Sequence, residues 1–323
     1  MNKGIRVVFM GTPDFAVASL KAILNANIEV AAIVTAQDKP SGRGMQMRES
    51  AVKIAAKEHN IKPVLQPEKL KDPQFLKALG ELNADLFVVV AFRMLPEAVW
   101  QMPRLGTINL HASILPHYRG AAPINWAIIN GEKESGVTTF FIEKEIDTGK
   151  ILLQEKVTIG EEETAGELHD KLMMVGASLL VKTIKLIETG NIKALPQNLN
   201  YANTSLKLAP KIFKEHCKIN WSDEGQKIAD LIRGLCPYPA AYSDFLTEDN
   251  KLLQIKIFQV KFEIQKHNLQ TGIVEYPNQK QMRVACSNGF IYILSLQMAG
   301  KKQMDIESFL RGFPGKDRKI KAF

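Results

Sequence analysis

Short apolar runs alternate with segments of helical spacing along the first 190 residues of the chain. The run at residues 5–10 is almost continuous, which is typical of a strand buried on both faces. Residues 15–24 then repeat apolar side chains at helical spacing, and residues 28–34 form a second apolar run. This order of strand, helix and strand predicts a right-handed βαβ unit.

The same alternation continues to about residue 188, and its strongest buried-strand signal is the sequence DLFVVVAF at residues 85–92. Further strands are expected at 107–110, 137–142 and 151–159, and further helices at 50–59, 73–82, 123–129 and 164–188. Because strands alternate with helices, the pattern predicts an open α/β sheet.

The pattern changes near residue 190. Residues 190–208 are polar and lack a clear period, which predicts a linker. Beyond it, one helix is expected at 223–235, and strands are expected at 252–262, 272–275, 282–285 and 290–296. Short strands separated by turn residues predict a small β-barrel or sandwich. We therefore expect one domain over residues 1–189, the linker, and a second domain over residues 209–323.

The composition argues against a disordered chain and against a membrane channel. Hydrophobic residues make up 46% and charged residues 24%, the mean hydropathy is −0.09, and no stretch approaches 18 uninterrupted apolar residues. The three cysteines contain no CxxC pair, so they indicate neither a zinc site nor a disulfide framework, and we expect no bound metal. The N-terminus lacks the long apolar core of a signal peptide, which predicts a cytoplasmic protein.

The net charge of +8 is unevenly distributed. Residues 209–323 carry 18 basic and 12 acidic side chains, so six of the eight net charges lie in the last third of the chain. Such an excess admits a polyanionic partner, with Lys301 and Lys302 among the candidate contacts. An ordinary solvated surface explains the same excess equally well.

Two early segments stand where the predicted strands end. Gly11-Thr12-Pro13 lacks the G-x-G-x-x-G dinucleotide fingerprint, so it is either a tight turn or an anion site at a helix N-terminus. Arg43 lies between two glycines in a polar loop after the second strand. Open α/β folds bind ligands at this edge of the sheet, so the loop either grips a large anionic substrate or is simply solvated.

The segment at residues 106–123 is the most informative. Asn109 and His111 are two positions apart, so they point the same way if the strand reaches residue 111. A loop rich in proline follows. Asp147 comes after a second strand end, where its carboxylate either orients the His111 imidazole or forms a turn with its own backbone before Gly149.

Taken together, these residues resemble a known family. Asn109-x-His111, followed by Ser113-x-Leu115-Pro116 and by Asp147 36 positions after the histidine, resembles the catalytic pattern of 10-formyltetrahydrofolate-dependent enzymes. Three longer motifs resemble the methionyl-tRNA formyltransferase family in particular: FMGTPDFA at 9–16, LPHYRGAAPI at 115–124 and Pro-Tyr-Pro at 237–239. The Gly-Arg-Gly loop around Arg43 also fits this family.

The resemblance implies a Rossmann-like N-terminal domain and a C-terminal β-barrel of the oligonucleotide-binding kind. It implies transfer of a formyl group from 10-formyltetrahydrofolate to the α-amino group of methionine on initiator tRNA, by a protein that we expect to be a monomer. Asn109, His111 and Asp147 would be catalytic, Ser113, Ile114, Leu115 and Pro116 would line the folate site, and the Arg43 loop would approach the acceptor end of the tRNA.

Three other functions remain open from the sequence. A formyltransferase that acts on a small amine would use the same catalytic residues, but an enzyme of that kind with a single domain leaves residues 209–323 unexplained. A formyl-folate hydrolase would replace the amine with water. A nucleic-acid-binding protein with a vestigial α/β domain would bind folate without transferring the formyl group.

Overall fold

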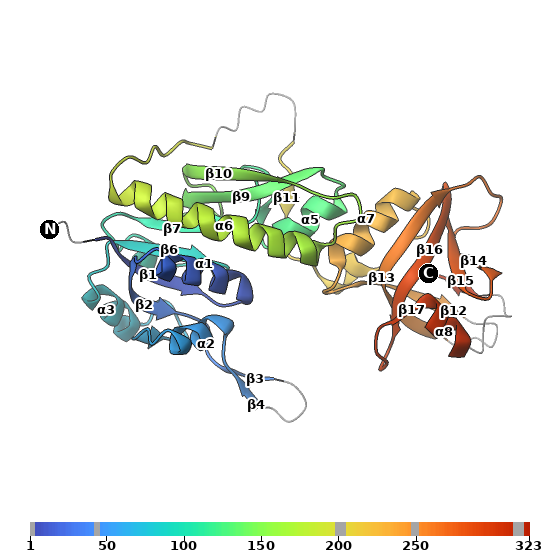
Figure 1. The fold of residues 1–323 in the computed structure, drawn as a ribbon, viewed down its shortest axis with the longest axis horizontal. Helices are drawn as coiled ribbons and strands as arrows, with labels where there is room; N and C mark the ends of the chain where they lie inside the picture. The colour runs from blue at the N-terminus through green and yellow to red at the C-terminus, as the bar shows by residue number, and fades with distance from the viewer. Residues whose placement is uncertain (1–3, 42–45, 198–204, 247–251, 313–319) are drawn as a thin grey trace. The chain divides into compact units, whose positions relative to one another are not determined.

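The computed structural model describes residues 4–41, 46–197, 205–246, 252–312 and 320–323 (Figure 1). The chain forms two compact units. The first comprises residues 1–120, 135–157 and 169–208, and the second comprises residues 121–134, 158–168 and 209–323. Two short segments that precede residue 169 therefore group with the C-terminal part, whereas the polar–apolar pattern suggested contiguous domains.

A seven-stranded sheet forms the centre of the first unit. Its strands lie in the order β10-β9-β7-β6-β1-β2-β5. Their bounds are β1 (Arg6–Gly11), β2 (Glu29–Val34), β5 (Val64–Leu65), β6 (Leu86–Val90), β7 (Thr107–His111), β9 (Glu134–Phe141) and β10 (Ile151–Thr158). The five strands from β5 to β7 in this order pair in parallel, and β9 pairs antiparallel with β7. The predicted open, Rossmann-like α/β sheet is confirmed.

Helices pack on this sheet because each presents an apolar stripe to it. Their bounds are α1 (Asp14–Asn25), α2 (Ala51–Glu58), α3 (Pro73–Glu81), α4 (Glu97–Trp100) and α6 (Ala165–Glu188), whereas α5 (Pro123–Ile129) belongs to the second unit. Helices α1 and α6 lie side by side, and the rings of Phe15 and His169 are 5.2 Å apart (Figure 1). A hydroxyl pair 2.8 Å apart, Thr139 and Thr183, fixes α6 on β9.

The loop expected after the second strand contains a small hairpin instead. Strands β3 (Lys39–Ser41) and β4 (Gln46–Arg48) pair antiparallel within it. Lys53 of α2 holds its base, with Nζ 2.5 Å from Asp38 and 3.2 Å from Glu49. Arg43 itself lies outside the described residues.

The sheet changes its winding direction between β1 and β6. The chain leaves β1 toward β2 and β5, and then returns to the other side of β1 as β6. Ligands of open α/β sheets bind outside the carboxyl ends of the strands near such a point. Gly11 is the last residue of β1 at this point. The position needs a glycine because a Cβ would lie 2.6 Å from the Ala16 Cβ and 3.0 Å from the Val90 carbonyl oxygen.

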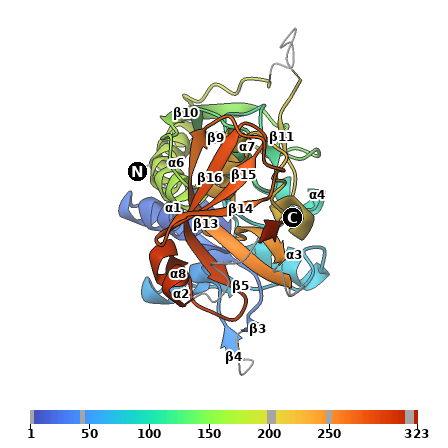
Figure 2. The same cartoon turned by 90° about the vertical axis from the view of Figure 1, so that its right-hand side faces the viewer.

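The second unit is a curled antiparallel sheet with a helix packed against it (Figure 2). Its elements are α7 (Gly225–Leu235), β12 (Ala241–Leu246), β13 (Leu252–Ile264), β14 (Val274–Asn278), β15 (Gln281–Cys286), β16 (Gly289–Met298), β17 (Met304–Asp305), α8 (Ile306–Gly312) and β18 (Lys321–Ala322). Ile228 and Ile232 of α7 join Phe245, Ile257 and Ile291 in one buried core.

Backbone hydrogen bonds join the two ends of this sheet into a barrel. The strands lie in the order β14-β15-β16-β13-β12-β18. The Val274 N–H donates to the Ile320 carbonyl at 3.0 Å, and the Ala322 N–H donates to the Gly272 carbonyl at 2.8 Å, so β18 pairs with the chain at the start of β14. The predicted small β-barrel is confirmed.

Short elements connect these parts. They are β8 (Arg119–Gly120), β11 (Leu208–Ala209) and a 3₁₀-helix at Lys214–Cys217. Within the described ranges, no helix combines the length and the apolar character needed to cross a bilayer.

Candidate functional site

Strand β7 presents Asn109 and His111 on one face. The strand extends one residue further than the sequence predicted and includes His111, so the two side chains point the same way. The His111 side chain is buried, and Asn109 is half-buried. Within the described part of the chain, the Asn109 amide has no hydrogen-bond partner, so its donors and acceptor are available to a substrate.

The His111 imidazole is held at both ring nitrogens. Nε2 lies 2.9 Å from the Tyr118 carbonyl, and a carbonyl can only accept, so we assign the proton to Nε2. Nδ1 faces Asp147 Oδ2 at 3.8 Å, which is too long for a hydrogen bond but short enough for an ion pair with a charged imidazole. In the neutral ring, Nδ1 therefore carries the lone pair that can accept a proton.

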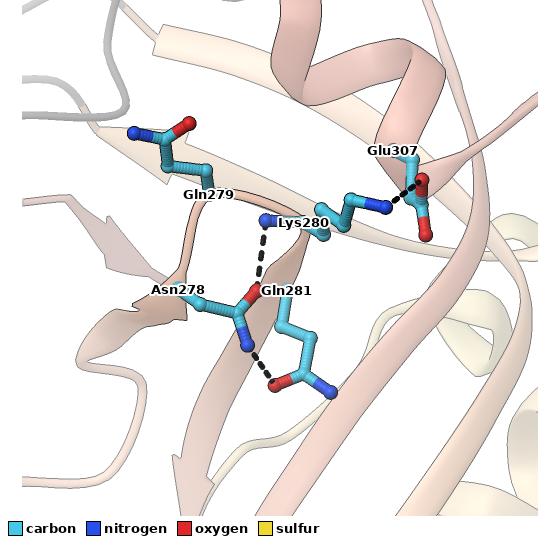
Figure 3. Close-up of a pocket in the computed structure, with 5 residues that line it drawn as sticks. All are labelled: Asn278, Gln279, Lys280, Gln281 and Glu307. Atoms are coloured by element: carbon cyan, nitrogen blue, oxygen red, sulfur yellow. Dashed lines mark hydrogen bonds and ion pairs between the residues drawn. The ribbon is translucent and has the colours of Figure 1, made fainter.

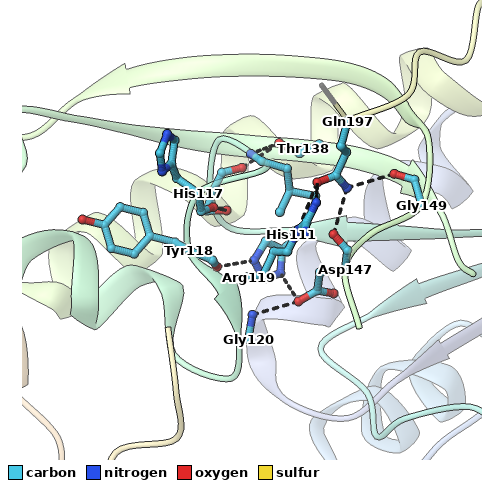
Figure 4. A network of polar contacts seen from close by, with 11 residues as sticks. His111, His117, Tyr118, Arg119, Gly120, Thr138, Asp147, Gly149 and Gln197 are labelled. Carbon is cyan, nitrogen blue, oxygen red and sulfur yellow. Dashed lines mark hydrogen bonds and ion pairs between the residues drawn. The ribbon is translucent and has the colours of Figure 1, made fainter. Parts of the chain in front are cut away.

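The Asp147 carboxylate binds a neighbouring segment and not its own loop. The Gly120 N–H donates to Asp147 Oδ2 at 2.9 Å (Figure 4). Asp147 has φ +54°, a left-handed conformation that a residue with a side chain seldom adopts. Of the two sequence interpretations of Asp147, the geometry favours the one in which its carboxylate faces His111.

Gln197 and Arg119 complete the polar network. Gln197 was not identified from the sequence, and Arg119 was included in the motif at 115–124 without being given a role. Gln197 Nε2 donates to the Asp147 and Gly149 carbonyls at 2.8 and 2.9 Å, and Gln197 Oε1 accepts from the Arg119 guanidinium (Figure 4). Burial lowers the pKa of Arg119, and the nearby carboxylates of Asp147 and Glu145 oppose this effect. Gln197 lies in a polar segment without periodicity, so no local signal identified it.

The expected folate-binding residues form a compact turn with occupied polar groups. Ser113, Leu115 and Pro116 are buried, and Ile114 is half-buried. The Thr138 hydroxyl donates to the Ser113 carbonyl at 2.7 Å, and Gln154 Nε2 donates to the Leu115 carbonyl at 2.9 Å. The turn can therefore shape a pocket wall but has few free hydrogen-bonding groups.

The expected tRNA contacts are not part of this network. Lys301 and Lys302 lie in the second unit, between β16 and β17, and both are exposed. Neither forms an ion pair with a described residue. Both side chains are therefore available to an anionic partner.

A separate hollow of about 430 Å³ lies at the turn between β14 and β15 in the second unit (Figure 3). Lys280 and Glu307 form an ion pair of 3.4 Å on its wall, and Asn278, Gln279 and Gln281 complete the lining. It contains none of the residues that the sequence singled out. Within the described residues, no group of three or more His, Cys, Asp or Glu side chains is arranged to hold a metal ion.

Comparisons with known families match nearly the whole chain. A family model described as "Formyl transferase" matches residues 5–184, and one described as "Formyl transferase, C-terminal domain" matches residues 211–314. A methionyl-tRNA formyltransferase of Bacteroides thetaiotaomicron is 48% identical over 312 residues, which cover 97% of each chain. One of Parabacteroides distasonis is 50% identical over 314 residues, again covering 97% of each chain.

Solved structures share the fold at lower identity. A sugar 3N-formyltransferase, WlaRD, solved with dTDP and 5-N-formyl-THF, has a TM-score of 0.63 and 23% identity, and the match covers 93% of this chain and all of that one. HypX of Aquifex aeolicus, in complex with tetrahydrofolic acid, has a TM-score of 0.62 and 16% identity. The match covers 96% of this chain but only 47% of HypX, so the chain spans about half the length of that protein.

Proposed function

This chain belongs to the methionyl-tRNA formyltransferase family, and on that premise we propose that Asn109, His111 and Asp147 carry out its formyl transfer. The reaction moves a formyl group from 10-formyltetrahydrofolate to the α-amino group of methionine on initiator tRNA. One observation carries the proposal: His111, the last residue of β7, and Asp147, in the loop between β9 and β10, lie 3.8 Å apart, and β7 also carries the unpartnered Asn109 amide.

The attacking amine needs little activation. An α-amino group has a pKa near 8, so roughly a tenth of it is already neutral at pH 7. The harder step is the build-up of negative charge on the formyl oxygen as the nitrogen attacks. The Asn109 amide donates a hydrogen bond to that oxygen, and one such donor typically contributes about 10²–10³ in rate. Because the Nε2–H of His111 is already donated to the Tyr118 carbonyl, His111 donates to the oxygen from Nδ1, in the charged form of its ring.

Asp147 orients His111 and assists proton movement. The new bond forms between the amine nitrogen and the formyl carbon, and the bond between that carbon and the folate nitrogen breaks. The amine loses one proton, and the departing folate nitrogen gains one. His111 and Asp147 lie 3.8 Å apart, so this pair of side chains can pass the proton along.

The remaining site residues have binding roles. The wall of the folate pocket is shaped by the turn at Ser113, Ile114, Leu115 and Pro116. Backbone groups of Ser113 and Leu115 are already paired with Thr138 and Gln154, so the turn contributes shape more than hydrogen bonds. Arg43, Lys301 and Lys302 contact tRNA phosphates, which position the nucleic acid without reading its sequence. We further propose that the protein acts as a monomer in the cytoplasm.

Single substitutions test the catalytic assignment. We expect Asn109→Ala, His111→Ala and Asp147→Ala each to lower kcat for formylation of initiator Met-tRNA by about 10²–10³, because each removes a group that acts in the transition state. His59→Ala changes an exposed histidine of the first unit and should retain full activity. Near-normal turnover of a folded variant would remove that residue from the scheme.

The choice of substrate tests the function itself. Charged initiator tRNA, charged elongator tRNA and free methionine are supplied with 10-formyltetrahydrofolate, and the formylated product is quantified. We expect the initiator species to be formylated fastest. Equal activity on free methionine would instead indicate a small-amine formyltransferase, and formate release without a formylated product would indicate a hydrolase.

A further inference from the structure

We propose that Gln197 is a positioning residue for formyl transfer, which holds the Asp147 loop at the distance from His111 that the reaction needs. The proposal rests on the function proposed above, because it gives Gln197 a role only through Asp147. Gln197 does not contact His111 in the network, and its amide contacts Arg119 and the backbone on either side of Thr148.

The partners of the Gln197 amide determine its orientation. The Arg119 guanidinium can only donate, so the oxygen of Gln197 must face it. The carbonyls of Asp147 and Gly149 can only accept, so the nitrogen must face them. No other side chain of this length offers one acceptor on one side and two donors on the other.

Gln197 is attached to a fixed part of the sheet. Two residues earlier, Leu195 exchanges two backbone hydrogen bonds of 2.8 Å with Ile151, the first residue of β10. The backbone that carries Gln197 is therefore tied to the strand next to β9. The amide can transmit this fixed position to the Asp147 loop.

The Asp147 loop needs such support. Residues 143–146 before Asp147 are exposed, and Asp147 has φ +54°. Residues in this region persist only when the surrounding structure holds them there. Two supports act on Asp147 itself: the Gly120 N–H donates to its carboxylate, and the Gln197 amide donates to its backbone carbonyl.

Loss of the Gln197 amide would release one of these two supports. The Asp147 and Gly149 carbonyls would then turn toward water, and the carboxylate would move relative to His111. A displacement of about 1 Å in a catalytic group can cost about 10²-fold in rate. Binding of folate and tRNA would change little, because Gln197 contacts the loop backbone and Arg119 and none of the proposed binding residues.

Two substitutions of similar size test this role. Gln197→Met keeps the length of the side chain but removes every hydrogen bond, and we expect kcat to fall about 10–100-fold with little change in KM for either substrate. Gln197→Glu keeps the acceptor for Arg119 but cannot donate to the two carbonyls, so we expect it to be no more active than Gln197→Met. Gln101→Met changes an exposed glutamine of the first unit and serves as the control.

A double-mutant cycle with Asp147→Asn separates positioning from a general loss of structure. If Gln197 acts through the Asp147 carboxylate, the double variant Gln197→Met/Asp147→Asn should be no slower than Asp147→Asn alone. If Gln197 only supports the fold, the two reductions in kcat should multiply, and the proposal is wrong. Circular dichroism and thermal unfolding report whether each variant is folded, and Gln197→Glu provides the test if Gln197→Met does not fold.

The cycle also separates this proposal from the proposed function. If Gln197→Met has the kcat of the wild-type protein while the kcat of Asp147→Asn is strongly reduced, only the positioning role would be overturned. Wild-type turnover of Asp147→Asn would overturn the catalytic assignment itself. A reduced kcat in Gln197→Glu and Gln197→Met, without a further reduction in the double variant, would support the positioning role.

Discussion

A glycine and hydrogen bonds together define the position of the Asp147 loop. A Cβ on Gly149 would overlap the carbonyl oxygen of Phe141, the last residue of β9. The Phe141 N–H also donates to the Lys150 carbonyl at 3.0 Å, so the loop closes tightly on the end of its own strand. Because residue 149 has no side chain, the loop can close on β9, and the Asp147 carboxylate can then reach the Gly120 N–H.

We therefore expect Gly149→Ala to displace Asp147. Since the overlapping atom belongs to the backbone, the loop must move, and a shift of about 1 Å would lower kcat by about 10–100-fold. Steady-state formylation kinetics and thermal unfolding would measure the effect. Gly80→Ala is the matched control, since its Cβ would meet only Met102 Sδ, at 3.8 Å, and it should keep full activity. A fully active Gly149→Ala protein would contradict the argument.

The barrel of the second unit depends on how its first and last strands meet. Gly272 has φ +87°, and a Cβ there would overlap the Ala322 carbonyl oxygen. Only a glycine allows the chain before β14 to approach β18 closely enough for the bonds from Ala322 to Gly272 and from Val274 to Ile320. The closure removes the free edges that an open sheet would expose.

Gly272→Ala should destabilise the second unit more than the backbone conformation alone explains. Gly300→Ala is the matched control, because Gly300 has φ +75° but nothing within 4 Å of its Cβ. We expect a loss of about 1–2 kcal/mol at Gly300 from the left-handed conformation, and a further 1–3 kcal/mol at Gly272 from the overlap. Urea unfolding of both variants would measure the difference, and equal losses would contradict a role for the close approach.

On the scale of the whole molecule, the positive charge gathers in one part of the chain. Residues 209–323 carry a net charge of +6, against +2 for the residues before them. The first 208 residues also contain the proposed catalytic groups. The basic C-terminal part thus offers phosphate contacts in addition to the formyl chemistry.

Binding of tRNA should therefore weaken steeply as salt is added. Each protein–phosphate contact contributes about 0.7–0.9 to the slope of log K against log salt concentration. We expect Lys301→Ala/Lys302→Ala to reduce this slope by about 1–2 while kcat at saturating tRNA stays unchanged. Lys77→Ala alters an exposed lysine of α3 that faces Glu81 and should leave the slope unchanged. A binding constant that is insensitive to salt would contradict the electrostatic account.

The pattern of apolar residues was sufficient to predict those strands and helices whose buried residues repeat within a short stretch of sequence. The run at residues 85–92 became the fully buried β6, and the long apolar period near residue 170 became α6. Strand β12 alternates buried and half-buried residues, but its buried Ser243 and its half-buried Tyr242 and Leu246 break the apolar–polar alternation, so the sequence did not predict it. The hairpin of β3 and β4 was also missed, because three-residue strands carry almost no periodic signal.

The fold class and the resemblance to formyltransferases could be read from the amino-acid sequence, because they depend on local spacing and on motifs within short segments. The shared face of Asn109 and His111 was predicted on the condition that the strand reached residue 111, and the structure met this condition. The folded chain was needed to show that Asp147 meets His111 and Gly120, that the Gln197 amide donates to the Asp147 loop, and that Gly272 meets Ala322. Asp147 lies 27 positions from Gly120 and 50 positions from Gln197 in the sequence. No hydrophobic period links such distant residues. Strand β9 runs antiparallel to β7 and ends beside Ile108, so the path of the loop after β9, and not the position of the strand end, brings Asp147 to His111.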